Sequence, residues 1–91
     1  MSLLQFALLE LHDAMLRIRI EANRARLSRA GTKYANFDYL YGQFCGVRFG
    51  FASALIFMTS EYDLFKEQAE AFNNEASFLI DHYAERGRSE Q

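Results

Sequence analysis

The sequence predicts an all-α protein in which two or three long helices pack as an antiparallel hairpin or bundle. Apolar residues recur in alternating steps of three and four along most of the chain, which is the spacing of one helix face. No proline occurs, and the only convincing loop is AGTKYAN at residues 30–36. With 91 residues, the chain has the size of one domain. We expect one helical domain over residues 1–86 and a frayed tail over residues 87–91.

The first helix is expected over residues 3–30, with Ser2 as its N-cap and Gly31 just past its end. Its main apolar row consists of Leu4, Leu8, Leu11, Met15, Ile18, Ala22 and Ala25. A second row, about 140° around the helix at 100° per residue, consists of Leu9, Leu16, Ile20 and Leu27. A surface helix of a monomer needs only one apolar stripe. We therefore expect the second row to form an oligomer interface, in a homodimer or a larger assembly.

The second helix is expected over residues 37–58, with Asn36 as its N-cap. Its apolar row consists of Phe37, Leu40, Phe44, Val47, Phe51, Ala54 and Met58. A β-hairpin over residues 37–51, turning at Gly42 and Gln43, is the alternative, because the apolar residues also alternate between Cys45 and Phe51. The helical pattern lasts longer than this alternation and favours the helix.

The third helix is expected over residues 61–86, where Ser60 and Asp63 resemble a capping box and Gly87 can end the helix. Its apolar row consists of Tyr62, Phe65, Ala69, Phe72, Ala76, Leu79 or Ile80, and Tyr83, and a further row of Leu64, Ala71 and Phe78 follows. Because few residues separate the second and third segments, residues 37–86 could instead form one long helix bent at Thr59 and Ser60.

Three glycines four apart, Gly42, Gly46 and Gly50, continue to Ala54 along one side of the second segment. Each glycine costs about 0.8–1 kcal/mol relative to alanine inside a helix. We expect close approach of another helix to offset this cost, so the row is a predicted helix-packing or oligomer interface. The sequence leaves open whether that helix belongs to the same chain or to a second copy. Membrane insertion is disfavoured by Arg48 in the middle of the segment.

The stretch YLYGQFCGVRFGFASALIFM, residues 39–58, resembles segments of small helical bacteriophage proteins. Their pattern is Tyr-x-x-Gly-x-x-x-Gly-x-Arg-x-x-x-x-Ala-Leu, with Ala-Leu displaced by one position here. The matching positions, which cover about a fifth of the chain, are Tyr39, Gly42, Gly46, Arg48, Ser53, Ala54 and Leu55. The resemblance implies no activity and no catalytic residues, but it favours a phage or prophage origin and hence the cytoplasm of the host.

Charge is unevenly distributed along the chain. Residues 61–91 are acidic, and the face with Asp63, Glu67, Glu70, Asp81 and Glu85 is expected to be solvated or, less often, to imitate nucleic-acid phosphates. Residues 17–33 are basic through Arg17, Arg19, Arg24, Arg26, Arg29 and Lys33. The two segments are expected to complement each other within a bundle or across an oligomer, and nucleic-acid binding by the basic segment is the alternative.

The sequence contains no constellation that indicates catalysis. His12–Asp13 and Asp81–His82 are sequence neighbours that point about 100° apart on a helix, and only His82 and Glu85 have a spacing that could share a metal ion. The single cysteine, Cys45, fits a reducing cytosol and has no base placed beside it. We expect no enzyme activity, no cofactor, no metal and no small-molecule substrate.

The sequence thus favours a non-enzymatic protein–protein association module, a small phage-type regulator or inhibitor of a host protein. Arg48 is expected to extend toward solvent along its apolar stem, or less often to form a buried ion pair or dock a partner.

Overall fold

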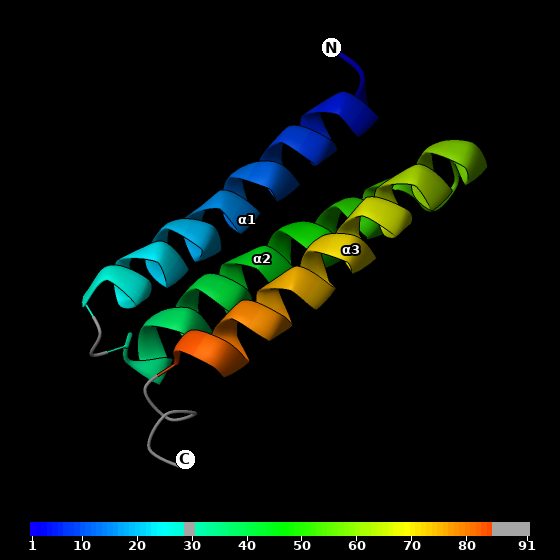
Figure 1. Ribbon diagram of the computed structural model, residues 1–91. Coiled ribbons are helices and arrows are strands. Elements are labelled where there is room, and N and C mark those ends of the chain that lie inside the picture. The colour runs from blue at the N-terminus through cyan, green and yellow to red at the C-terminus, as the bar shows by residue number, and fades with distance from the viewer. Residues whose placement is uncertain (29–30, 85–91) are drawn as a thin grey trace.

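Three helices form the fold of this computed structural model, which describes residues 1–28 and 31–84. They are α1 (Leu3–Ser28), α2 (Tyr34–Leu55) and α3 (Thr59–Tyr83). Figure 1 shows that α1 is antiparallel to α2 and that α2 is antiparallel to α3, so α1 and α3 run in the same direction. Each helix packs against the other two in a bundle measuring 44 × 22 × 17 Å. The predicted all-α bundle is confirmed, with three helices.

The start of α1 is a reciprocal capping box. The Ser2 hydroxyl accepts a hydrogen bond from the Gln5 backbone N–H at 3.1 Å, and the Gln5 side-chain oxygen accepts one from the Ser2 N–H at 2.9 Å. Two backbone donors at the helix start, where no intrahelical acceptor is available, are thereby satisfied. The prediction that Ser2 caps this helix is confirmed.

The two other helix starts lack the predicted caps. Helix α2 begins at Tyr34, so Asn36 lies inside it, and Lys33 occupies the cap position without a side-chain hydrogen bond. Helix α3 begins at Thr59 after Met58, again without a side-chain cap. The Ser60 hydroxyl donates to the neighbouring Glu61 carboxylate at 3.0 Å, so the predicted capping box is wrong.

The loop after α1 is tied to the end of α3. Gly31 has a φ of 79°, a left-handed conformation that glycine adopts without steric cost. The buried Thr32 then donates its backbone N–H to the Tyr83 carbonyl at 3.2 Å, and Thr32 forms an isolated parallel bridge with Ala84. The predicted ends of the first and third helices, at residues 30 and 86, lie outside the described residues.

The connection between α2 and α3 is a tight reversal. Helix α2 ends at Leu55, three residues earlier than predicted, and the backbone of Met58, with φ −109° and ψ 79°, leaves the helical conformation. Residues 56–58 supply the turn between the two helices. The single bent helix over residues 37–86 is therefore wrong, and so is the β-hairpin over residues 37–51, which are helical throughout.

The core follows the predicted main rows of all three helices. Its largest fully buried side chains are Phe37, Phe44, Phe65, Leu11, Met15, Ile18 and Leu55. Small residues on α1 and α3, among them Ala22 and Ala76, complete the cluster and let the helices approach closely. The predicted row of α2 fails only at its end, because Ala54 and Met58 are exposed and Leu55 is buried instead.

Candidate functional site

The surface of α2 that faces away from the core is uncharged over its last four turns. Every exposed residue between Tyr39 and Ala54 belongs to this surface, here called the α2 outer face: Tyr39, Gly42, Gln43, Gly46, Phe49, Gly50, Ser53 and Ala54. Exposed helix faces normally carry charged side chains that keep them solvated. This face instead offers glycine backbone flanked by two exposed aromatic rings.

The three glycines of the α2 outer face lie in open space. A Cβ atom built on Gly42, Gly46 or Gly50 would meet nothing within 4 Å beyond the helix itself. Of the two alternatives that the sequence leaves open, a helix of the same chain does not pack on this row within the described residues, and packing by a second copy stays a prediction. A side chain at Gly46 has room within the chain, so we expect a substitution there to leave the fold intact.

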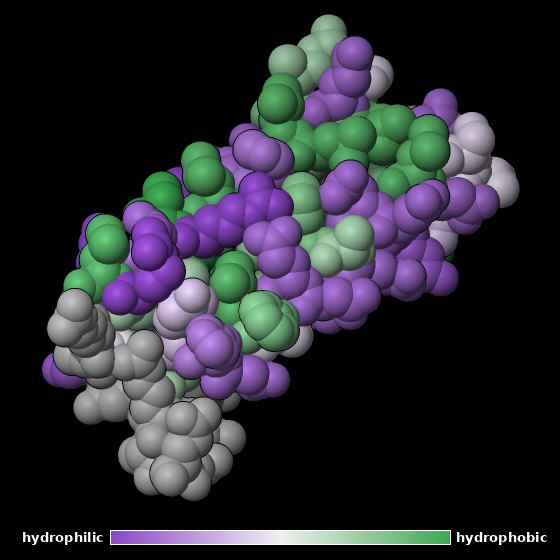
Figure 2. Space-filling model, viewed as in Figure 1, coloured by the Kyte–Doolittle hydropathy of each residue, from purple (hydrophilic) through white to green (hydrophobic). Residues whose placement is uncertain are grey.

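The second apolar row of α1, here called the α1 outer row, also lies on the surface. The side chains are 55%, 41%, 50% and 67% exposed for Leu9, Leu16, Ile20 and Leu27. Figure 2 shows hydrophobic side chains along the outer edge of α1. The prediction that α1 has two apolar faces is confirmed, since one face enters the core and the other is uncovered.

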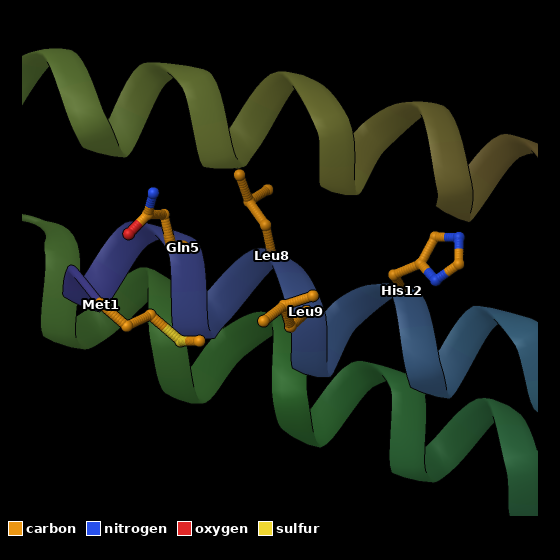
Figure 3. Close-up of a pocket in the computed structure, with 5 residues that line it drawn as sticks. All are labelled: Met1, Gln5, Leu8, Leu9 and His12. Carbon is orange, nitrogen blue, oxygen red and sulfur yellow. The ribbon is translucent and has the colours of Figure 1, made fainter.

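A third apolar region lies at the end of the bundle where the chain begins and α2 turns into α3 (Figures 1 and 2). Phe57 in the turn is 94% exposed, and Ile56 and Met58 beside it are exposed as well. A hollow of ≈ 530 Å³ opens near this end and is lined by Met1, Gln5, Leu8, Leu9 and His12. In Figure 3, Leu8 extends from α1 toward α3, whereas Leu9 lies on the outer side of α1.

Most of the predicted basic residues are engaged within the chain. Arg17 forms an ion pair with Asp13 at 3.3 Å, and Arg24 forms one with Glu21 at 3.5 Å. The Arg26 guanidinium donates to the Asn23 side-chain oxygen at 2.8 Å. Lys33 is exposed, and Arg29 lies outside the described residues. Those of these cations that the structure describes are therefore not gathered into one uncompensated patch.

Arg19 connects α1 to α3 through a two-pronged ion pair. Its Nε and Nη2 atoms donate to the two carboxylate oxygens of Glu75 at 2.6 and 2.7 Å, and its guanidinium carbon lies 5.4 Å from the centre of the Phe72 ring. The hydrogen bonds from Arg19 lower the pKa of the Glu75 carboxyl, although partial burial opposes the shift. Among the described residues, this is the one ion pair that joins the basic and acidic segments.

Arg48 is half-buried rather than fully extended into solvent, and its guanidinium carbon lies 5.2 Å from the centre of the neighbouring Phe49 ring. None of the ion pairs between described residues includes it, so a buried pair is not formed. Burial raises the pKa of the nearby Tyr41 phenol, and contact with the Cys45 thiol adds to this effect. The Tyr41 hydroxyl donates to the Asn73 side-chain oxygen at 2.5 Å and so links α2 to α3.

The histidines and acidic residues form no chemical site within residues 1–28 and 31–84. No group of three potential metal ligands occurs there. The His82 ring stacks on Phe78 and contacts Tyr83 edge-on, while the His12 ring lies against Phe72. Asp63, Glu67, Glu70 and Asp81 are exposed on α3, and Glu85 lies outside the described residues.

Two features of these surfaces could not be predicted from the sequence. The apolar turn at residues 56–58 looks like a continuation of the helix, because its residues extend the apolar run of α2. The Arg19–Glu75 pair joins residues 56 positions apart, and nothing in the spacing of either segment indicates which arginine meets which carboxylate.

The exposed features of residues 1–28 and 31–84 are the uncharged α2 outer face, the α1 outer row and the apolar turn at residues 56–58. Within the described residues, no helix combines the length and hydrophobicity that crossing a membrane requires. Comparisons with models of protein families, with curated proteins and with solved structures find no match to this chain.

Proposed function

We propose that this protein is a non-enzymatic association module that binds another protein through the α2 outer face. The observation that carries the proposal is the absence of charge from every exposed residue between Tyr39 and Ala54. Charge is typically depleted at the centre of a protein interface, and aromatic residues are enriched there. Tyr39 and Phe49 supply the aromatic rings, and the glycines between them leave the helix backbone accessible.

The energetics of the glycines support the same proposal. Together the three glycines destabilise α2 by about 2.5–3 kcal/mol relative to alanine, and no contact with a described residue requires their lack of side chains. A partner helix that approaches the backbone closely would offset this cost, as in small-xxx-small packing. The glycines thus have a role in a complex that they lack in the isolated chain.

The resemblance of residues 39–58 to phage proteins favours a regulator or inhibitor that acts on a bacterial host protein. Nucleic-acid binding is less well supported, because Arg17, Arg19 and Arg24 already have carboxylate partners in the chain. A nucleic-acid surface would need cations that are free to neutralise phosphates.

The proposal can be tested by affinity capture from a bacterial lysate with and without nuclease. We expect a specific protein to be retained by the wild-type chain under both conditions. Gly46→Lys should abolish its retention, because the substitution places a charge in the middle of the α2 outer face without a clash inside the chain.

The matched control is Ala71→Lys, which adds the same charge to an exposed position of α3 and should leave capture unchanged. Equal capture by the wild type and Gly46→Lys would contradict the proposed face. Loss of capture after nuclease treatment, together with DNA or RNA binding that weakens steeply with salt and with Arg17→Glu, would support the nucleic-acid alternative.

A further inference from the structure

We propose that the α1 outer row is a surface for pairing with a second copy of this chain, with the two α1 helices antiparallel around a twofold axis at the level of residue 18. The inference goes beyond the proposed function, since it assigns an occupant to a second surface of the chain. The row is exposed at all four of its apolar positions and has no partner among the described residues.

The exposed positions of α1 continue the row into a heptad pattern. Steps of four, three, four, three and four connect Leu9, Asp13, Leu16, Ile20, Asn23 and Leu27, all of which are exposed. This is the spacing of the contact positions in a coiled coil. The core-facing row of α1 is a separate set of residues, so the bundle can form without using these positions.

The pattern is symmetric about residue 18. In an antiparallel pair centred there, Leu9 meets the partner's Leu27, and Leu16 meets the partner's Ile20. Asp13 then meets the partner's Asn23, so the two polar positions face each other and the carboxylate can accept a hydrogen bond from the amide. A parallel pair would instead place Asp13 against the partner's Asp13, and like charges would repel. Polar residues at such positions commonly set the register of coiled coils.

The flanking charges favour the same orientation. Glu10 lies on one flank of the row near one end, and Arg24 lies on the same flank near the other end. Within one chain they are separated by about 21 Å along the helix, so they cannot pair with each other there. In the antiparallel dimer each Glu10 approaches the partner's Arg24, which keeps its own 3.5 Å ion pair with Glu21 and is 71% exposed. The two copies of Arg17 come near the axis, where each retains its own Asp13 at 3.3 Å.

The hollow beside Leu9 gives the partner's Leu27 a place to pack. Leu27 is the most exposed side chain of the row, and in this register it reaches the level of Leu9. The hollow there is lined by Met1, Gln5, Leu8, Leu9 and His12 (Figure 3). A leucine that enters this hollow would be buried at both ends of the symmetric interface.

The interface is small, because the row spans about 27 Å of helix with four aliphatic side chains from each copy. It falls near the lower end of specific interfaces, at about 1,200 Å² in total. We therefore expect a dissociation constant of about micromolar magnitude and a dimer population that rises with protein concentration.

Cysteine cross-linking tests both the surface and the orientation. Leu9→Cys and Leu27→Cys are made separately in a Cys45→Ser background, and each variant is incubated alone and as an equal mixture in a glutathione redox buffer at high micromolar concentration. We expect the mixture to form a disulfide-linked dimer that contains one copy of each variant. Each variant alone should yield less than about a tenth as much disulfide-linked dimer as the mixture. The reason is that an antiparallel pair keeps the two copies of the same cysteine about 27 Å apart along the helices.

Cross-linking of each variant alone as efficiently as the mixture would overturn the antiparallel arrangement. Sedimentation that shows a monomer at high micromolar concentration would overturn the inference as a whole. A dimer in sedimentation without any cross-link would do the same, because it would place the interface elsewhere. All the substituted α1 positions are exposed, so circular dichroism should show an unchanged fold.

A charge exchange gives an independent test. Glu10→Arg and Arg24→Glu should each weaken dimerisation about tenfold, because each creates two like-charged pairs across the interface. The double variant Glu10→Arg, Arg24→Glu should restore the wild-type dissociation constant to within about threefold. Additive weakening in the double variant would overturn the proposed register, since the two sites are too far apart in one chain to rescue each other.

The outcomes for the two proposals are separable. A monomer that still captures a host protein in a Gly46-dependent manner would overturn the dimer and leave the proposed function intact. A cross-linked dimer that captures nothing from the lysate would overturn the proposed function and support the self-pairing of α1.

Discussion

The outer faces of α2 and α3 differ sharply, although both helices bury their opposite faces in the same core. On α3 the exposed positions include Asp63, Glu67, Glu70 and Asp81, and the helix starts and ends with polar residues. On α2 no exposed residue between Tyr39 and Ala54 carries a charge. Both faces are open to solvent, but they differ in charge. On α3 the predicted further row is exposed, with Leu64 at 56% and Phe78 at 66%, and it lies beside carboxylates that keep the face solvated. The α2 outer face has no such charges.

Burial within the single chain does not distinguish these two surfaces. The glycines of α2 and the carboxylates of α3 are all exposed, and an accessibility measurement alone would treat them alike. The stability cost of the glycines and the missing charges separate the two faces. Three experiments test this difference between the two helices, and the largest expected effect comes from their inner faces.

Phe44→Ala on α2 and Phe65→Ala on α3 should destabilise the protein to a similar extent. Both rings are fully buried in the shared core, and truncation of such a ring removes buried area and leaves a cavity. We expect each variant to lose about 3–5 kcal/mol of unfolding free energy, measured by urea denaturation followed by circular dichroism. A loss below about 1 kcal/mol in either variant would show that the two inner faces do not contribute to one core.

Replacing Gly42, Gly46 and Gly50 together with alanine should stabilise the isolated chain. Nothing within 4 Å opposes the added Cβ atoms, so we expect a gain of about 2–3 kcal/mol from helix propensity. Urea denaturation followed by circular dichroism measures this gain.

The matched control is the opposite change on α3, Ala71→Gly at an exposed position, which should cost about 1 kcal/mol. Destabilisation by the triple alanine variant would mean that the α2 outer face is already packed against something in the isolated chain. Such a result would show that the α2 outer face, unlike the exposed face of α3, is not free in the isolated chain.

The smallest effect is the pH dependence that comes from Glu75. The Arg19 guanidinium holds the pKa of this carboxyl below its usual value of 4.5, so the folded state favours the charged form. The stabilisation is present above the unfolded pKa and is lost as the pH falls through the lower folded pKa. Because the two side chains are 36% and 37% exposed, we expect no more than about 1 kcal/mol.

Glu75→Gln should reduce the loss of stability between pH 7 and pH 3, measured as the shift of the urea midpoint relative to the wild type. Glu67→Gln, at an exposed position of the same helix, should leave that loss as it is in the wild type. If the two variants respond identically, Glu75 is only another solvated carboxylate of α3.

The periodic features of the fold could be predicted from the sequence. Steps of three and four identified the buried rows on all three helices, and Ser2 was identified as a cap from its position before the first apolar residues. The helix boundary at Leu55 could not be predicted, because Ile56, Phe57 and Met58 have the same apolar character as the helix they follow. Local composition does not reveal this turn, because the turn results from the packing of α3 against α1 and α2.

The two candidate surfaces were predictable to different degrees. The α1 outer row was visible as a second apolar stripe, because helical spacing fixes which residues share a face. The glycine row was equally visible, but periodicity specifies only that its members point in one direction and not what they point at. Only the tertiary structure decided that α1 and α3 both pack elsewhere on α2 and leave the glycines uncovered.

The sequence by itself thus determined the helices and their faces, since both follow from 100° of rotation per residue and the separation of apolar from polar side chains. The tertiary structure decided which face is inside, where α2 turns and that Arg19 meets Glu75. These outcomes depend on contacts between residues distant in the chain, and a local pattern contains no information about such contacts.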